Sequence, residues 1–116
     1  AVQFRGVLAI RPDHPLAMAG LAWVLATTAD SSLHNPDEAV RLAERAAAAT
    51  AENNVTVLDA LGAAYASAGR FDEAVSAVQR GIKLATASRL DAAVGQLQHR
   101  LDMYKRRQPF RQSKFL

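Results

Sequence analysis

A four-residue segment occurs twice in this chain, and it constrains the fold more than any other feature. Asp37-Glu38-Ala39-Val40 recurs as Asp72-Glu73-Ala74-Val75, 35 positions further along. In each copy two acids precede an apolar stripe with the period of an amphipathic helix, so each copy is predicted to open a helix. Helix pairs that recur at a period of roughly 20 to 50 residues are typical of solenoids. We therefore predict an all-α, helical-repeat solenoid.

The composition agrees with closely packed helices and limits the chemistry. Half of the 116 residues are apolar and only 6% are aromatic, and no segment shows a run of β-branched residues. There is no cysteine, which excludes disulfides, thiolate nucleophiles and cysteine-ligated zinc. A chain of this length has room for one domain. We expect that domain over residues 1–104, with a basic tail over 105–116.

The net charge of +3 comes from the tail. Residues 105–116 contain five cations and no acid, which leaves −2 for residues 1–104. The charge therefore gives little support for a nucleic-acid-binding face. With Phe110 and Phe115 among its cations, the tail is compatible with RNA or an anionic membrane surface, or it is a solvated extension. Without a stacking platform no specific nucleic acid is expected.

Apolar periodicity divides the domain into six predicted helices. Residues 1–12 are expected to be the second helix of an incomplete repeat, 15–50 a repeat with a lengthened inter-helix loop, 54–86 a further repeat and 88–104 a capping helix. Because no capping residue precedes Ala1, we expect a piece of a longer protein.

Helix boundaries are marked by residues with known end preferences. Asn35 with Pro36 predicts a helix start, and Asn53 or Asn54 predicts the next one. Gly69 is predicted to end that helix in the left-handed conformation. Ser88 and Asp91 have the spacing of a capping box, which predicts that Ser88 opens the last helix.

The second repeat has the residue pattern of a known family. The matching positions are Leu58, Leu61-Gly62, Tyr65, Gly69, Phe71, Ala74 and Gly81. With them the chain resembles the tetratricopeptide repeat (TPR) family, as the C-terminal repeats of a larger bacterial-type member. Met18, Leu21-Ala22, Leu25, Ala39, Ala43 and Ala46 fit the same frame in the first repeat, so the resemblance covers residues 1 to about 86. It implies a right-handed solenoid, a C-terminal cap, and a concave groove where a protein or peptide partner binds.

The resemblance also indicates which residues face that groove. They are Leu16, Ala19, Trp23, Ala26 and Thr27 in the first repeat, Thr56, Asp59, Ala63 and Ser67 in the second, and His99 and Asp102 in the cap. The candidate partner-binding residues are Trp23, Thr27, Thr56, Asp59, Ala63, Ser67 and His99. These positions lack the lysine and asparagine pattern with which some members clamp a terminal carboxylate.

Trp23 and Asp59 each have a second interpretation. Trp23 lies about 200° around its helix from Leu21 and Leu25, so it is a candidate hot spot for binding. Alternatively, it packs against a neighbouring helix and completes the core. Asp59 either lines the groove or lies on a solvated helix face.

Catalysis is not expected. His14, His34 and His99 are not spaced to ligate one metal, and nothing arranges a nucleophile, a base and an orienting acid. We therefore expect no enzyme activity and no cofactor, and interpret the histidines as surface residues.

Two alternatives to a binding scaffold remain open. One is an accessory domain that positions substrate or mediates oligomerisation in a larger enzyme, such as a glycosyltransferase. The other is self-association through the apolar stripe of the N-terminal edge. The longest apolar stretch, from Leu16 to Ala29, is interrupted by Gly20 and is too short to span a membrane. A soluble protein is expected, with the cytoplasm favoured over the periplasm.

Overall fold

The computed structural model describes residues 14–111, which form five α-helices and no strand. The helices are α2 (Pro15–Thr27), α3 (Pro36–Ala49), α4 (Val55–Ser67), α5 (Phe71–Ala87) and α6 (Asp91–Lys105). The all-α prediction is confirmed for this part of the chain. The helix expected over residues 1–12, and the apolar edge expected to self-associate, lie outside the described residues.

Two asparagines open helices as predicted. The Oδ1 atom of Asn35 accepts a hydrogen bond from the backbone N–H of Glu38 at 3.2 Å, and Pro36 follows as the first residue of α3. Asn54 accepts from the N–H of Val57 at 3.1 Å and so opens α4. In both cases a side-chain oxygen satisfies a backbone donor that the first turn leaves free.

Gly69 ends α4 as predicted, but the predicted capping box of α6 is wrong. Gly69 has a φ of 78°, and the N–H of Arg70 bonds the carbonyl of Tyr65 at 2.8 Å. The end of α5 repeats this motif with Arg89 at a φ of 58°. Ser88 is therefore the C-cap of α5, and α6 begins after Leu90 without a side-chain cap. The chain turns one residue after Ser88, too late for Ser88 to start a new helix.

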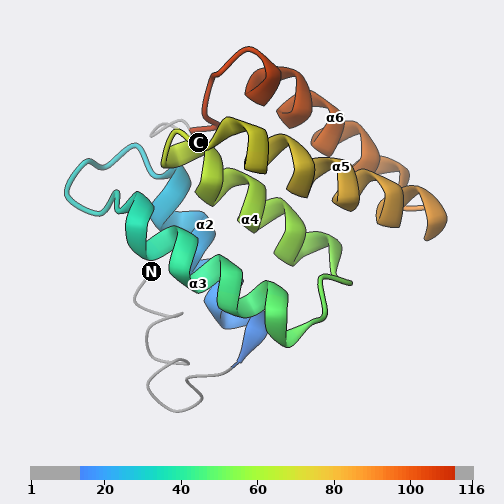
Figure 1. Cartoon of the computed structure of the whole chain (residues 1–116), viewed down its shortest axis with the longest axis horizontal. Coiled ribbons are helices and arrows are strands. Elements are labelled where there is room, and N and C mark those ends of the chain that lie inside the picture. Colours follow the sequence, from blue (N-terminus) through green and yellow to red (C-terminus); the bar gives the residue numbers. More distant parts are fainter. Residues whose placement is uncertain (1–13, 112–116) are drawn as a thin grey trace.

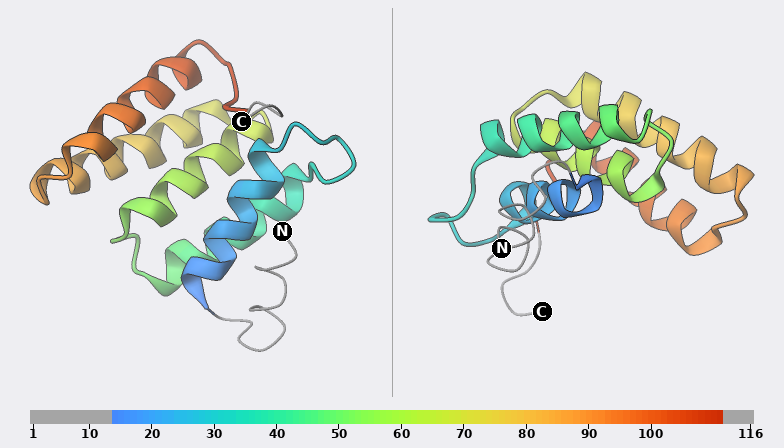
Figure 2. Two further views of the ribbon diagram at one scale, coloured as in Figure 1. Left: turned by 180° about the vertical axis from the view of Figure 1, so that it is seen from behind. Right: turned by 90° about the horizontal axis from the view of Figure 1, so that it is seen from below.

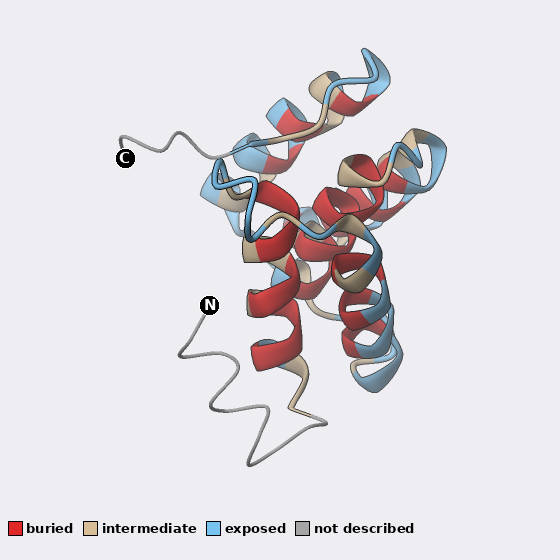
Figure 3. Cartoon of the chain, turned by 90° about the vertical axis from the view of Figure 1, so that its left-hand side faces the viewer, coloured by how far each residue is buried: buried red, intermediate tan, exposed pale blue. Residues whose placement is uncertain are grey.

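Helix α4 lies at the centre of the molecule and contacts each of the other four helices. In Figure 1 it runs between α3 and α5, with α6 beyond α5. Every residue of α4 from Val57 to Ala66 except Asp59 is buried, as expected for a helix with neighbours all round. Figure 3 shows the buried faces of the helices turned toward one another and the exposed faces turned outward.

Two glycines allow neighbouring helices to approach closely. A Cβ atom on Gly62 of α4 would lie 2.7 Å from Cγ2 of Val78 on α5. A Cβ on Gly81 of α5 would lie 3.3 Å from Cδ1 of Leu97 on α6. Close-packed interiors leave no room for an added methyl group at such crossings. These positions therefore set the spacing from α4 to α5 and from α5 to α6.

The helices pack with extents of 34 × 28 × 25 Å and a radius of gyration of 13.1 Å. Within residues 14–111, no helix combines the length and the apolar character needed to cross a bilayer.

Candidate functional site

Arg100 of α6 and Asp59 of α4 form a buried ion pair. Nε of Arg100 donates to Oδ1 of Asp59 at 2.6 Å, and Nη2 donates to Oδ2 at 2.5 Å. The exposed fraction is only 10% for the arginine side chain and 19% for the aspartate side chain. Burial opposes the charge of Arg100, but the hydrogen bonds and the negative charge of Asp59 outweigh it and raise the pKa of Arg100. The two parallel bonds fix the orientation of the planar guanidinium.

Two aromatic rings lie against this fixed guanidinium. Its Cζ atom is 5.0 Å from the ring centroid of Trp23 and 4.9 Å from that of Phe110. The two rings are themselves 5.4 Å apart and tilted by 36°. These distances are typical of cation–π and aromatic pair interactions. Trp23, Asp59, Arg100 and Phe110, here called the aromatic–arginine cluster, thus join α2, α4, α6 and the segment after α6.

The cluster spans a gap that the helix backbones leave. Helices α2 and α6 both contact α4, but no Cα atom of α2 lies within 8 Å of one of α6. The long side chains of Trp23 and Arg100 reach across this gap. The cluster therefore lies on one face, formed by α2, α4 and α6. On this face α2 and α6 are connected by side chains and not by close backbone packing.

Tyr104 is the buried neighbour of the ion pair. It is fully buried, and its hydroxyl has no hydrogen-bond partner within the described residues. Burial, and then the negative charge of Asp59, raise the pKa of Tyr104 well above its usual value. The phenol therefore stays neutral at ordinary pH and contributes packing beneath the cluster.

Of the seven candidate residues, the structure brings Trp23 and Asp59 together. Trp23 is half-buried and packs partly against the core. Asp59 pairs with Arg100, and with its side chain 19% exposed it is not on a solvated face. Thr27 and Ala63 are buried, the former with its hydroxyl donating to the carbonyl of Trp23 at 2.7 Å. No side-chain contact with the cluster is seen for the remaining three among the described residues. Thr56 is exposed beside a separate hollow of about 380 Å³, Ser67 donates to the carbonyl of Ala64, and His99 is exposed.

The segment after α6 returns along the body of the protein. Figure 2 shows it running from the end of α6 back toward α2. Arg107 pairs with Asp72 at 3.0 Å, and Phe110, half-buried, packs on Trp23. Within residues 106–111 the tail is therefore not a freely solvated extension. The remainder of the tail, which includes Phe115, lies outside the described residues.

His34 contacts the last described residue of this segment. Nη1 of Arg111 lies 3.1 Å from Nε2 of His34. A guanidinium can only donate, so Nε2 must accept and the imidazole is neutral in this contact. Burial, and then the positive charge of Arg111, lower the pKa of His34. At neutral pH the imidazole is therefore in the uncharged form that this contact requires.

A second histidine, His14, has a structural role at a helix end. Nδ1 of His14 accepts from the backbone N–H of Ala17 at 3.2 Å and caps α2. Among residues 14–111, no three side chains of the metal-ligating types gather into a candidate metal site.

Arg100 and Phe110 are site residues that were not predicted from the sequence. Arg100 stands between Leu97 and Tyr104 on the buried stripe of α6, at spacings of three and four residues. A charged residue at a stripe position requires an oppositely charged partner on a facing helix. This was the signal available in the sequence. Nothing comparable marks Phe110, because its position depends on how the chain turns after α6.

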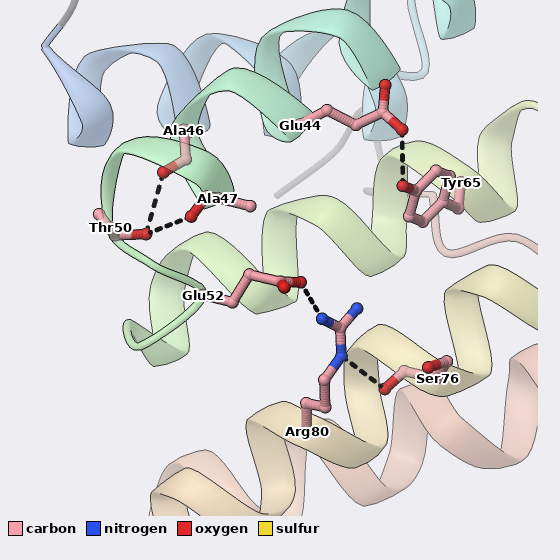
Figure 4. A network of polar contacts seen from close by, with 8 residues as sticks. All are labelled: Glu44, Ala46, Ala47, Thr50, Glu52, Tyr65, Ser76 and Arg80. Atoms are coloured by element: carbon pink, nitrogen blue, oxygen red, sulfur yellow. Dashed lines mark hydrogen bonds and ion pairs between the residues drawn. The ribbon is translucent and has the colours of Figure 1, made fainter.

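A second polar surface lies where α3 and the loop after it face α4 and α5, as Figure 4 shows. The hydroxyl of Tyr65 donates to Oε2 of Glu44 at 2.7 Å, while Arg80 pairs with Glu52. A hollow of about 210 Å³ between them is lined partly by Leu61 and alanines. The two acids of this hollow, Glu44 and Glu52, already have partners within the protein. The first contact connects α3 to α4, and the second connects the loop after α3 to α5.

Another cavity, of about 480 Å³, lies between Arg107 and residues 69–73. It contains two cations, but each is paired: Arg70 with Glu73 at 2.7 Å, and Arg107 with Asp72. The local charge is balanced, which gives no preference for an anion.

The Tyr65 hydroxyl is expected to make stability fall at alkaline pH. Burial, and then its hydrogen bond to Glu44, raise the pKa of Tyr65 to about 12. Between pH 10 and 12 the unfolded state loses this proton and the folded state keeps it, so the free energy of unfolding falls as pH rises. We expect Tyr65→Phe to remove about 1 kcal/mol of that fall, below the roughly 2.7 kcal/mol of two full pKa units. Urea denaturation at pH 8 and pH 11.5 measures it, and equal pH slopes in the two proteins would contradict the assignment.

Comparison of the chain with family models, with curated proteins and with solved structures gives no match in any of the three.

Proposed function

We propose that this chain is a TPR-like, right-handed solenoid segment that binds an extended segment of a partner protein and has no catalytic role. The binding surface is the face formed by α2, α4 and α6. The observation that carries the proposal is the aromatic–arginine cluster, in which Trp23, Asp59 and Arg100 come from three different helices and meet on this face.

The order of contacts supports a repeat architecture. Along the chain, α2 packs on α3, α4 on α5, and α5 on α6, while α2 also packs on α4. Helices α3 and α5 have no backbone contact with each other. Such nearest-neighbour stacking is the pattern of helical repeats, with α6 in the position of a terminal cap. Gly62 and Gly81 lie at helix crossings, where the family pattern has small residues.

The composition of the cluster supports binding. Tryptophan and arginine are enriched among the residues that dominate protein interfaces. Here Asp59 fixes the arginine, so no side-chain freedom would be lost when a ligand stacks on it. The half-buried Trp23 offers an aromatic surface next to it. Preorganised groups of this kind favour recognition of a flat apolar side chain on an extended segment.

The expected result of Trp23→Ala is loss of peptide binding with the fold retained. Random dodecapeptides selected on the immobilised wild-type chain supply the probes, and fluorescence anisotropy of the labelled peptides gives their affinities. We expect about 10- to 30-fold weaker binding to the variant, the loss typical of a hot spot. Circular dichroism and urea denaturation check that helix content and cooperative unfolding are kept.

Arg80→Ala is the matched control, because Arg80 is an exposed residue of α5 on the second polar surface. It should leave the affinities unchanged. If the selection gives no binders, or if Trp23→Ala and Arg80→Ala bind them equally well, the proposed surface is wrong. If Trp23→Ala abolishes cooperative unfolding, Trp23→Leu, which keeps apolar volume and removes the ring, replaces it in the comparison and should show the same loss of affinity.

A further inference from the structure

The chain's own C-terminal segment already places Phe110 on the proposed binding face. Its side chains make contacts at Arg107, Phe110 and Arg111. Arg107 pairs with Asp72 at 3.0 Å and lies 5.9 Å from the ring centroid of Phe71. The ring of Phe110 lies on Trp23 and Arg100, and Arg111 contacts His34 at 3.1 Å.

Helix α6 ends at Lys105, and Pro109 lies immediately before the aromatic residue. The segment begins with the turn that ends α6, where Arg107 has a φ of 60° and the N–H of Gln108 bonds the carbonyl of Met103 at 2.9 Å. It continues to Arg111 without helix, with one aromatic side chain docked on the aromatic–arginine cluster.

The chemistry of the docked contact is specific to a ring. The guanidinium of Arg100 is held in one plane by Asp59, and its Cζ atom lies 4.9 Å from the ring centroid of Phe110. A guanidinium attracts the π-face of a ring, and the neighbouring indole adds a second aromatic contact. An aliphatic side chain would keep some apolar contact and lose both of these interactions. The face therefore distinguishes aromatic from aliphatic side chains.

The contacts that flank Phe110 are weak enough for the segment to leave. The side chains of Arg107 and Asp72 are 57% and 91% exposed. Exposed ion pairs of this kind contribute little free energy to holding a segment in place. Arg111 is exposed as well, and it meets a neutral imidazole rather than an acid. Phe110 is the one aromatic anchor of this segment on the cluster, and it is only half-buried. Occupancy of the face thus depends mainly on a single ring.

We propose that the face recognises a partner segment through an aromatic side chain, and that the segment around Phe110 occupies the same place as an internal competitor. This inference rests on the proposed binding function and adds to it the chemistry of the ligand. A tethered segment has an effective local concentration near the millimolar range. A partner must therefore displace Phe110 before its own ring can bind, which lowers its apparent affinity.

A peptide copy of the segment tests the inference directly. The probe is the hexapeptide Arg-Arg-Gln-Pro-Phe-Arg, which reproduces residues 106–111. Trp23 is the only tryptophan of the chain, so its fluorescence reports on the cluster. Phe110→Ala should shift the emission to longer wavelength by uncovering the indole, and adding the hexapeptide should reverse this shift saturably. The wild-type chain should need about tenfold more peptide for the same occupancy.

Two control peptides separate ring recognition from charge. Arg-Arg-Gln-Pro-Ala-Arg keeps every cation and should leave the emission unchanged. The same peptide with leucine in place of phenylalanine should bind several-fold more weakly than the original. Equal binding of all three peptides would show that charge alone attracts them and would overturn the inference.

A measurement on the wild-type chain covers the case in which Phe110→Ala fails to fold. Nuclear Overhauser contacts between the rings of Trp23 and Phe110 should be present in the free protein and should disappear when excess hexapeptide is added. Absence of these contacts in the free protein, or their persistence at saturating peptide, would overturn the inference.

The two proposals fail in different ways. If dodecapeptides bind in a Trp23-dependent manner and the hexapeptide does not bind Phe110→Ala, the binding function stands and the internal competitor is wrong. If the hexapeptide binds and no dodecapeptide depends on Trp23, the face holds only the chain's own segment and the partner-binding function is wrong.

Discussion

Replacing Asp59 by alanine is expected to lower the free energy of unfolding by about 3 kcal/mol. The change leaves Arg100, of which 8% is exposed, without an anion in a buried position. Removal of one partner from a buried pair typically costs about 3–5 kcal/mol, and the partial exposure of Asp59 places this pair at the lower end. Urea denaturation followed by circular dichroism measures the loss.

Two further variants show whether burial is the cause. The double change of Asp59→Leu and Arg100→Met removes both charges and should recover most of the lost stability, because apolar replacements of a buried pair are often close to neutral. Asp72→Ala removes the partner of the exposed Arg107 and should leave the unfolding midpoint nearly unchanged. A double variant as unstable as Asp59→Ala would show that the pair itself, rather than an orphaned charge, accounts for the loss.

Gly62→Ala is expected to lower the free energy of unfolding by about 1–2 kcal/mol. Alanine gains about 1 kcal/mol over glycine within a helix. Against this gain, the new Cβ would lie 2.7 Å from Cγ2 of the fully buried Val78 and 3.6 Å from Cε2 of Tyr104. Val78 is branched at Cβ and cannot rotate away freely, so α4 and α5 must separate. The loss from overpacking therefore outweighs the gain in helix propensity.

Gly95→Ala is the matched control for this substitution. Gly95 lies in α6, and a Cβ there would meet nothing within 4 Å. The same change should therefore raise the free energy of unfolding by up to about 1 kcal/mol. Combining Gly62→Ala with Val78→Ala should cost less than the sum of the two single changes, because the second removes the methyl group that the first would strike. Equal effects of alanine at positions 62 and 95 would contradict the close crossing of α4 and α5.

Helix positions in the described chain could be predicted because their signals are local. Asn35, Asn54 and Gly69 determine helix ends through hydrogen bonds and backbone angles that involve only neighbouring residues. The error at Ser88 has the same origin. Both the end of α5 and the start of α6 were compatible with that serine, and the left-handed conformation of Arg89 decided between them.

The candidate site could be predicted only in part. The angle of Trp23 around its helix separated it from Leu21 and Leu25, but Ala19, Ala26 and Thr27 on the same side of α2 are buried, and Trp23 itself packs partly against the core. The repeat frame predicted that Asp59 shares a face with Trp23. Neither signal indicated that Asp59 would bind a side chain 41 residues away on another helix. The frame also included Ala63, which is buried because α4 has neighbours on all sides. A repeat pattern predicts toward which side of its helix a residue points, whereas its burial depends on which other helices pack against that side.

By itself the sequence determined the all-α class and the approximate positions of the helices between residues 15 and 105, apart from the start of α6, because apolar period and end residues act over one or two turns. Only the tertiary structure decided that Arg100 meets Asp59 between α4 and α6, and that Phe110 returns to cover Trp23. Those contacts join residues distant in the sequence. Their formation depends on the crossing of packed helices and on the turn after α6, neither of which a local pattern encodes.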